Sequence, residues 1–255
     1  MATVQGFWSG EVSSYTQRRI DIERILSMRT VDTFFQPIVD LQQMQIIGWE
    51  ALSRGPAGTP YERPDWLLQE AERVGLADEM DWLFFTSALD HALAAQLHGY
   101  ISVNIRPPSF DSVVSYLYRS DLLDRFGAAK LILEVTESAP VVHPEHMREA
   151  FQPLRERGAF LALDDVGAGH SNLYILAVLK PDFIKLDRRL VDGVAENPSL
   201  AALVMAVAQW AAKEGIGVIA EGVERPADLV ALRKMPVHCV QGFLLGRPRR
   251  HQESV

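Results

Sequence analysis

Short apolar runs alternate with longer amphipathic segments along the chain from about residue 33 onward. The short runs are rich in β-branched residues, which is typical of strands, and the longer segments place apolar residues at helical spacing between polar ends. This alternation predicts repeated βα units, in which helices cover a parallel sheet. Eight strands are predicted, at Thr33–Val39, Gln45–Leu52, Tyr100–Ile105, Lys130–Thr136, Phe160–Asp164, Phe183–Leu186, Gly217–Ala220 and Cys239–Gly242.

The amphipathic segments predict a helix after most of these strands. An additional helix is predicted before the first strand, at Thr16–Met28, with Thr16 as its N-cap and Ile20 and Ile25 on its apolar side. This first helix is expected either to plug or to flank the barrel, whereas the apolar sides of the helices between strands are expected to pack on the outside of the strands. The other predicted helices are Arg63–Val74, Asp78–Leu97, Pro108–Phe126, His143–Arg157, Asn172–Leu179, Ser199–Glu214 and Pro226–Lys234.

The connection between the first two strands breaks the βα pattern. Too few residues separate Val39 from Gln45 for a parallel crossover, which needs about a dozen, so these strands are expected to form an antiparallel hairpin. Helices separate the remaining strands, which are therefore expected to run parallel to one another. The predicted fold is an α/β TIM (β/α)8 barrel, modified by an antiparallel first strand.

Polar residues occur at the ends of the short apolar runs. Ionised groups buried at strand ends are costly unless a charge partner neutralises them. Because the carboxyl ends of parallel barrel strands meet at one rim, where barrel enzymes carry out chemistry, these side chains are expected to converge there. Converging oxygen donors predict a divalent metal site. The polar residues at these strand ends are Glu50, Asn104, Glu134, Asp164, Asp165, Lys185, Glu221 and Gln241.

Length and composition favour one domain. The chain has 255 residues, of which 48% are hydrophobic and 23% charged, enough to bury one large core. A single barrel domain is predicted at 16–249, after a flexible N-terminus at 1–15 and before a C-terminal tail at 250–255. The polar sequence RPRRHQESV is expected to be loose. About 30 residues before the first strand are too few for a sensory domain, so a regulatory protein partner, self-association or a region beyond this chain is expected to supply any input.

Charge and cysteine content narrow the partners and the compartment. A formal net charge of −8 and a pI near 5.4 argue against DNA, RNA or a membrane surface as the main partner, because those favour clustered Lys and Arg. The apolar helix candidate near Leu200–Ala212 is shorter than the roughly 18 to 20 residues of a membrane span. The single cysteine, Cys239, excludes an intrachain disulfide and favours a reducing cytoplasmic location.

Several sequence blocks resemble a known family. The block GWEALSR, which contains Glu50, Ala51 and Leu52, resembles the signature of the bacterial EAL domains. The blocks FQPIVD, SVNI, LEVTES, LALDDVGAGHSN, FIKLD, IAEGVE and VQGFLLGRP resemble its other landmarks in order, over roughly residues 20 to 249. This resemblance implies hydrolysis of cyclic di-GMP to linear pGpG, with Mg²⁺ or Mn²⁺, on a barrel whose first strand is antiparallel.

The resemblance also implies a ligand set for two divalent metal ions. Two such ions about 4 Å apart generate a hydroxide near neutral pH and neutralise the charge that develops at phosphorus. Adjacent aspartates in a strand normally point to opposite faces, so the strand must end and the backbone turn at Asp164 and Asp165. The implied ligands are Glu50, Asn104, Glu134 and Asp164 for one ion, and Asp165, Glu221 and the shared Asp164 for the other.

Four residues acquire catalytic roles by resemblance, and one of them, Glu221, is also an implied metal ligand. Lys185 is expected to position or polarise the attacking water and to offset negative charge at phosphorus. Gln241 is expected to orient a water bound to metal, and Glu137 to steady the loop after the fifth strand. Glu221 is proposed as a general base in some relatives, although a metal-bound glutamate is a weak base. The sequence leaves that choice open.

The substrate contacts follow from the same resemblance. Arg54 matches the phosphate-binding arginine and has the bidentate chemistry for it. Gln36, Leu52 and Asp187 are expected to contact guanine. The loop after the fifth strand departs from the family at three positions, which are Val166 for phenylalanine, His170 for an aromatic residue and Asn172 for serine.

Two alternative functions remain open at this point. A non-catalytic receptor would bind cyclic di-GMP and signal through a protein partner, and only the altered loop favours it. A barrel enzyme that abstracts a proton would use Lys185 as its base beside one Mg²⁺. A homodimer through the surface near Asn172–Leu179 is expected from the family.

Overall fold

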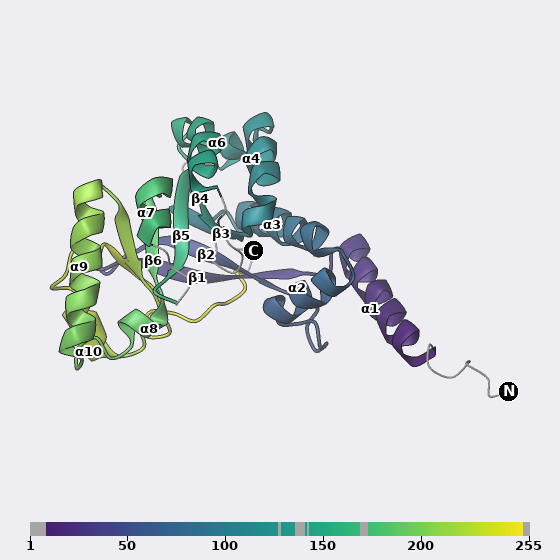
Figure 1. Cartoon of the computed structure of the whole chain (residues 1–255), viewed down its shortest axis with the longest axis horizontal. Helices are drawn as coiled ribbons and strands as arrows, with labels where there is room; N and C mark the ends of the chain where they lie inside the picture. The colour runs from purple at the N-terminus through teal and green to yellow at the C-terminus, as the bar shows by residue number, and fades with distance from the viewer. Residues whose placement is uncertain (1–8, 127–128, 136–140, 142, 169–172, 252–255) are drawn as a thin grey trace.

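A computed structural model describes residues 9–126, 129–135, 141, 143–168 and 173–251. Within these residues, eight strands close into a barrel in sequence order, with helices around the outside (Figure 1). The predicted TIM-like fold is therefore confirmed. The strands are β1 Asp32–Asp40, β2 Ile46–Arg54, β3 Tyr100–Ile105, β4 Lys130–Val135, β5 Phe160–Val166, β6 Phe183–Leu186, β7 Gly217–Ala220 and β8 Cys239–Val240.

Strand β1 runs antiparallel to both of its neighbours, β2 and β8. All other neighbouring strands pair in parallel. Asp40 stabilises the tight turn after β1, because its Oδ1 accepts the backbone N–H groups of Gln42 at 2.9 Å and Gln43 at 2.7 Å. The hairpin predicted from the short connection is confirmed.

Most predicted helices are present, with three differences. Helix α1 begins at Ser9, so Thr16 lies inside it and the predicted N-cap is wrong. The segment predicted as one helix at Pro108–Phe126 is broken at Ser120, where the guanidinium of Arg157 binds the carbonyls of Leu117 and Tyr118 at 3.2 Å. The short helix α8, Arg188–Val191, was not predicted. The helices are α1 Ser9–Met28, α2 Pro64–Arg73, α3 Ala77–Ala94, η1 Pro107–Ser109, α4 Phe110–Arg119, α5 Leu122–Arg125, α6 Pro144–Glu156, α7 Leu173–Leu179, α8, α9 Pro198–Glu214 and α10 Pro226–Leu232.

None of the helices within the described ranges has both the length and the apolar character that a membrane crossing requires.

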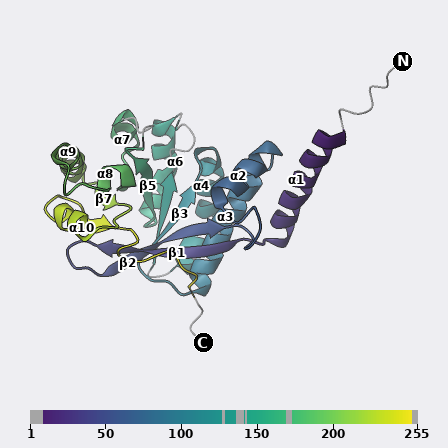
Figure 2. The same cartoon turned by 90° about the horizontal axis from the view of Figure 1, so that it is seen from below.

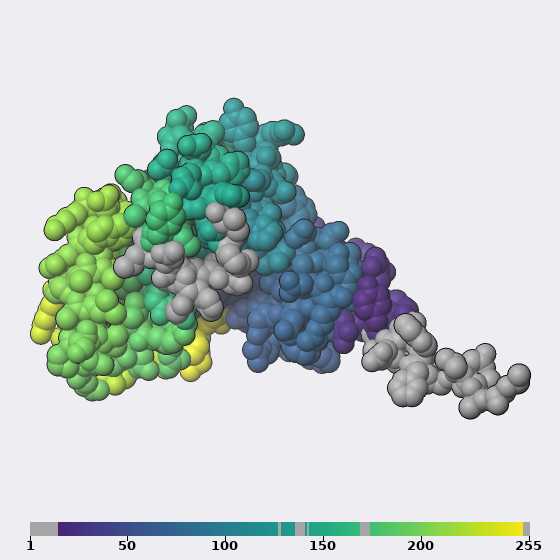
Figure 3. Space-filling view, viewed as in Figure 1, coloured from purple at the N-terminus to yellow at the C-terminus, as the bar shows by residue number. Residues whose placement is uncertain are grey.

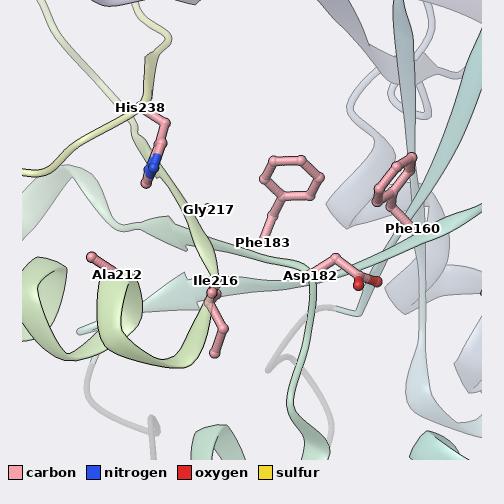
Figure 4. Close-up of a pocket in the computed structure, with 8 residues that line it drawn as sticks. Phe160, Asp182, Phe183, Ala212, Ile216, Gly217 and His238 are labelled. Carbon is pink, nitrogen blue, oxygen red and sulfur yellow. The ribbon is translucent and has the colours of Figure 1, made fainter.

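Aromatic rings close the end of the barrel where the parallel strands begin. Tyr100, Phe160 and Phe183 lie at the starts of β3, β5 and β6, with ring centroids 5.5 to 5.7 Å apart. Gly217 permits this packing, because a Cβ there would lie 2.5 Å from the Phe183 ring. A hollow of 360 Å³ is lined by Phe160 and Phe183 and also by His238 (Figure 4). This end of the barrel is opposite the strand ends that carry the predicted metal ligands.

Helix α1 packs against the lobe formed by α2 and α3, at the edge of the molecule (Figure 3). Ile22 and Ile25 of α1 are buried together with Leu67 of α2 and Phe84 of α3. Glu70 of α2 is buried and forms ion pairs with both Arg18 and Arg73. The helix is therefore part of the folded body and not a separate extension.

The C-terminal segment is docked as far as His251, which corrects the expectation of a loose tail for this part of RPRRHQESV, while residues 252–255 lie outside the described residues. Arg249 forms an antiparallel bridge with Phe35 of β1, with N–O distances of 2.8 and 3.1 Å. Arg250 pairs with Asp32, and the His251 ring lies 5.4 Å from that of Trp49. Figure 2 shows this segment beside the β1–β2 hairpin. The tail therefore extends the pairing along the edge of β1, and the His251 ring packs against Phe35 and Trp49.

Candidate metal centre and substrate site

The barrel brings the predicted polar residues to one rim. Asn104 of β3 pairs in register with Glu134 of β4, and Gln36 of β1 pairs with Glu50 of β2. Because side chains alternate along a strand, paired residues point to the same face, here the barrel interior. The remaining members are at or beyond the ends of their strands and complete the ring: Asp164 and Asp165 of β5, Lys185 of β6, Glu221 after β7 and Gln241 after β8.

Lys185 occupies the centre of the carboxylate cluster. Its Nζ lies 2.7 Å from Glu221 Oε1, 2.9 Å from Glu134 Oε2, 3.3 Å from Glu50 Oε1 and 3.4 Å from Asp164 Oδ1. The ammonium is fully buried. One positive charge thus faces four carboxylates, so the cluster carries excess negative charge whenever all four are ionised.

The pKa values reflect this excess. Burial raises the pKa of Glu134 to about 8, and it also raises the pKa values of Asp164 and Glu221, although Lys185 opposes the shift in each. Burial would raise the pKa of Glu50 too, but Lys185 and hydrogen bonds from Gln241 hold it below the usual value. Burial alone would lower the pKa of Lys185, yet the surrounding carboxylates keep it well above its usual value. Lys185 is therefore protonated.

Amide side chains surround Glu50. Asn104 Nδ2 donates to Glu50 Oε1 at 3.0 Å, and Gln241 Nε2 donates to Glu50 Oε2 and, at 3.1 Å, to Gln36 Oε1. The Oε1 atom of Gln241 is buried without a hydrogen-bond partner. A buried acceptor of this kind normally binds a water or an ion. Together with the carboxylates, it gives a donor set of oxygen atoms that fits a hard divalent cation.

The backbone turns sharply at the two adjacent aspartates. Asp165 has a φ of 57°, in the left-handed region that non-glycine residues rarely adopt, and its N–H donates to Asp164 Oδ1 at 2.8 Å. Gly167 follows with a φ of 102°. The turn brings both carboxylates to the same place, and such strain is typical of functional sites.

Two groups of carboxylates are close enough to hold metal. In each group the nearest oxygen atoms all lie within 4.8 Å of one another. The groups share Asp164 and coincide with the carboxylates of the two predicted ligand sets. They are Glu50, Glu134 and Asp164, and Asp164, Asp165 and Glu221.

Two hollows flank the carboxylate cluster. The first, of 280 Å³, is lined by Gln36, Leu52 and Asp187, the residues predicted to contact guanine. The second, of 620 Å³, lies towards α2 and is lined by Arg54 and also by Asn104 and Asp165. The site therefore has room on both sides of the candidate metal ligands. Three residues singled out in the sequence, Glu137, His170 and Asn172, lie outside the described residues.

The sequence interpretation missed Ser102. This residue is fully buried in β3, and its hydroxyl donates a hydrogen bond to Glu134 Oε1. It precedes Asn104 by two positions, so strand alternation places both side chains on the inner face. That spacing was the signal that would have identified it.

The sequence matches the family model described as EAL domain over residues 19–248. The cyclic di-GMP phosphodiesterase RocR of Pseudomonas aeruginosa is 31% identical over 238 residues, covering 91% of this chain and 61% of RocR. The cyclic di-GMP phosphodiesterase NbdA of the same organism is 29% identical over 242 residues, covering 91% of this chain and 30% of NbdA. The chain thus spans less than two thirds of the length of these relatives.

Several solved structures are similar to this chain in fold. PaMucR phosphodiesterase in complex with c-di-GMP is 28% identical, with a TM-score of 0.71 and coverage of 91% of this chain and 97% of that chain. The Xanthomonas citri FimX EAL domain in complex with c-diGMP shares the fold, with a TM-score of 0.80 at 21% identity and coverage of 93% and 95%. A manganese/cy-diGMP complex of Klebsiella pneumoniae BlrP1 is 28% identical, with a TM-score of 0.73 and coverage of 88% and 57%. With the family model matched over residues 19–248, the chain belongs to the EAL domain family.

Proposed function

We propose that this chain is a metal-dependent phosphodiesterase that hydrolyses cyclic di-GMP to linear pGpG. One observation carries the proposal: at the barrel rim the carboxylates form two adjoining groups, and four of them lie around a single ammonium. Lys185 alone leaves them with excess negative charge. The names of RocR and NbdA as cyclic di-GMP phosphodiesterases, and the c-di-GMP complex of PaMucR, support cyclic di-GMP as the substrate.

The carboxylates would hold two divalent ions, Mg²⁺ or Mn²⁺. Such ions supply a nucleophilic hydroxide near neutral pH and neutralise charge at the attacking and leaving oxygens. Glu50, Glu134 and Asp164 would hold one, with Asn104 as a further oxygen donor, and Asp164, Asp165 and Glu221 the other. The manganese complex of BlrP1 supports this choice of ions.

Lys185 and Gln241 act directly on the reaction in this proposal. The protonated Lys185 offsets negative charge at phosphorus and orients the attacking water by donating a hydrogen bond. Gln241 presents its buried Oε1 atom as an acceptor that orients a water of the site. Glu221 lies 2.7 Å from Lys185 and forms one carboxylate group with Asp164 and Asp165, which supports a ligand role. Glu137 stays a prediction as the residue that steadies the loop after β5.

The substrate lies across the rim in this proposal. Arg54 would bind phosphate from the larger hollow, as its guanidinium chemistry permits. Gln36, Leu52 and Asp187 would contact guanine in the smaller one. Asp187 is already oriented, because its Oδ1 accepts the N–H of Arg189 at 2.9 Å and caps α8.

Chromatography of cyclic di-GMP incubated with the full chain tests the proposal. Mg²⁺ or Mn²⁺ should give pGpG, EDTA should stop the reaction, and Glu50→Gln should abolish it. Glu214→Gln, at an exposed position of α9, is the matched control and should retain full activity. No linear product with either metal would contradict the proposal.

The receptor alternative rests on the altered loop, where Val166 is buried in the strand end. It predicts tight, metal-independent binding of cyclic di-GMP without turnover, which calorimetry with and without EDTA would detect. The proton-abstraction alternative is weaker. It needs a neutral Lys185, but the Nζ atom of this lysine lies within 3.4 Å of four carboxylates, which favour its protonated form.

Self-association and regulation belong to the same proposal. Tyr174 of α7 is 57% exposed, whereas Leu176 is buried, so part of the predicted dimer surface faces outward. We expect a homodimer, and a monomer mass by light scattering at micromolar concentration would count against it. Regulation through a protein partner and a cytoplasmic setting, favoured by the lone Cys239, also remain proposals.

A further inference from the structure

The β1–β2 hairpin continues beyond the barrel rim. Strand β2 pairs with β3 only as far as Ala51, while its pairing with β1 extends to Arg54. Along this extension, Phe34 lies opposite Leu52, and Asp32 lies opposite Arg54. Both pairs share the face of Glu50, because they are two and four residues away from it in a strand. The hairpin thus carries one row of side chains outward from the carboxylates.

The phosphate-binding candidate Arg54 rests on an aromatic ring of this row. Its Cζ atom lies 5.4 Å from the centroid of the Phe34 ring, and its Nη1 donates to the carbonyl of Ser53 at 2.7 Å. Arginine has a long, mobile side chain, and stacking on an aromatic face restricts its guanidinium while leaving its other donors available. Phe34 therefore limits where Arg54 can present its charge.

The docked C-terminal tail brings a second guanidinium to the same ring. The Cζ atom of Arg250 lies 5.7 Å from the Phe34 centroid, and Arg250 forms an ion pair with Asp32. Asp32 is also the residue directly across the hairpin from Arg54. Opposite residues in an antiparallel pair are close enough to interact, so Asp32 would compete for Arg54 if Arg250 were absent.

We propose that Phe34 is a positioning residue for substrate binding, which holds Arg54 for the phosphate while Arg250 keeps Asp32 occupied. This inference rests on the proposed function, since it assigns the substrate phosphate to Arg54. It places three residues without a predicted role, Phe34, Asp32 and, in the tail, Arg250, in the same substrate-binding arrangement.

A double-mutant cycle on the binding of cyclic di-GMP tests the role of Phe34. Calorimetric titration gives the Kd of cyclic di-GMP for the full chain and its variants. Ca²⁺ takes the place of Mg²⁺ or Mn²⁺ in the cell, and the cell contents are checked afterwards for linear product. Phe34→Leu keeps apolar volume but removes the ring, so it should weaken binding by about 3-fold to 30-fold. In an Arg54→Ala background the same change should alter the Kd by less than about twofold.

Phe34→Tyr, which keeps the ring, should bind within about twofold of the wild type. If Phe34→Leu fails to fold, Phe34→Met in the wild-type and Arg54→Ala backgrounds completes the same cycle. A purely structural role for Phe34 predicts an equal loss in both backgrounds, which would overturn the inference alone. A wild type that does not bind cyclic di-GMP would overturn the proposed function and the inference together.

Variants of Arg250 in the tail provide a second experiment, independent of the Phe34 variants. Arg250→Ala should weaken binding of cyclic di-GMP, and adding Asp32→Asn should restore it, because the competing carboxylate is then gone. Mn²⁺ affinity should be unchanged in both variants, since neither residue is among the candidate metal ligands. Unchanged binding in Arg250→Ala, or no recovery in the double variant, would contradict the role given to the tail.

Discussion

Lys185 and Glu134 form a fully buried ion pair inside the barrel, with Nζ donating to Oε2 at 2.9 Å. Both side chains are at most 1% exposed, and the other carboxylates of the cluster crowd the same ammonium. Such an arrangement is poorly suited to stabilise a fold, because burying charges costs about as much as their attraction returns. It is well suited to receive additional positive charge, which is the basis of the proposed metal centre.

Lys185→Met should destabilise the metal-free protein by about 3 to 5 kcal/mol, because the buried carboxylates lose their counter-charge. Mn²⁺ should recover part of this loss, since bound ions replace the missing charge. Urea unfolding with and without Mn²⁺ measures both effects. The exposed Lys213→Met is the matched control and should change neither curve appreciably. A metal-free stability equal to that of the wild type would contradict the electrostatic account of the cluster.

Ser102→Ala should weaken Mn²⁺ binding by about 10-fold to 100-fold, because Glu134 loses the hydrogen bond that orients it. Calorimetric titration with Mn²⁺ gives the affinity directly, without relying on turnover. Ser199→Ala, at an exposed position in α9, serves as the control. If both variants bound Mn²⁺ as tightly as the wild type, Ser102 would have no role in orienting the candidate ligand.

Cys239 should make the fold less stable at alkaline pH. Burial raises the pKa of its thiol from 9.0 to about 12, so the folded state keeps the proton that the unfolded chain releases. This contribution is therefore complete below about pH 9 and is lost as the pH rises towards 12. At pH 10 the loss amounts to about 1.4 kcal/mol. Urea unfolding at pH 8 and pH 10 should show a smaller decline for Cys239→Ala, and identical declines would contradict the prediction.

Gly217→Ala should destabilise the barrel by about 1 to 3 kcal/mol, because the new methyl group would overlap the Phe183 ring. Phe183→Leu in the same chain should relieve part of the cost, giving a favourable coupling between the two positions. Thermal unfolding of the single and double variants measures this coupling. Strictly additive effects would show that the ring does not require glycine at this position.

Strand ends and alternation made much of the site predictable from the sequence. Glu50 and Asn104 each close a short apolar run and Glu134 lies near the end of another, and a parallel barrel must bring such ends to one rim. The hairpin followed from the length of one connection alone. These features depend on neighbouring residues, which a sequence displays directly.

The features that escaped prediction depend on contacts between distant segments. The break after α4 is stabilised by Arg157, and the tail is docked by pairing with Phe35, far away along the chain. In the sequence Phe34 is an ordinary strand residue, and only the folded chain brings Arg54 and Arg250 to its ring. No local pattern of apolar and polar positions encodes these partners.

Anomalous diffraction from crystals of the full chain soaked in Mn²⁺ tests the central claim most directly. The account predicts two peaks about 4 Å apart at the barrel rim, next to the carboxylate groups that share Asp164. Lys185 should keep its place in β6. A rim without anomalous density, in crystals where the carboxylates remain paired only with Lys185, would contradict it.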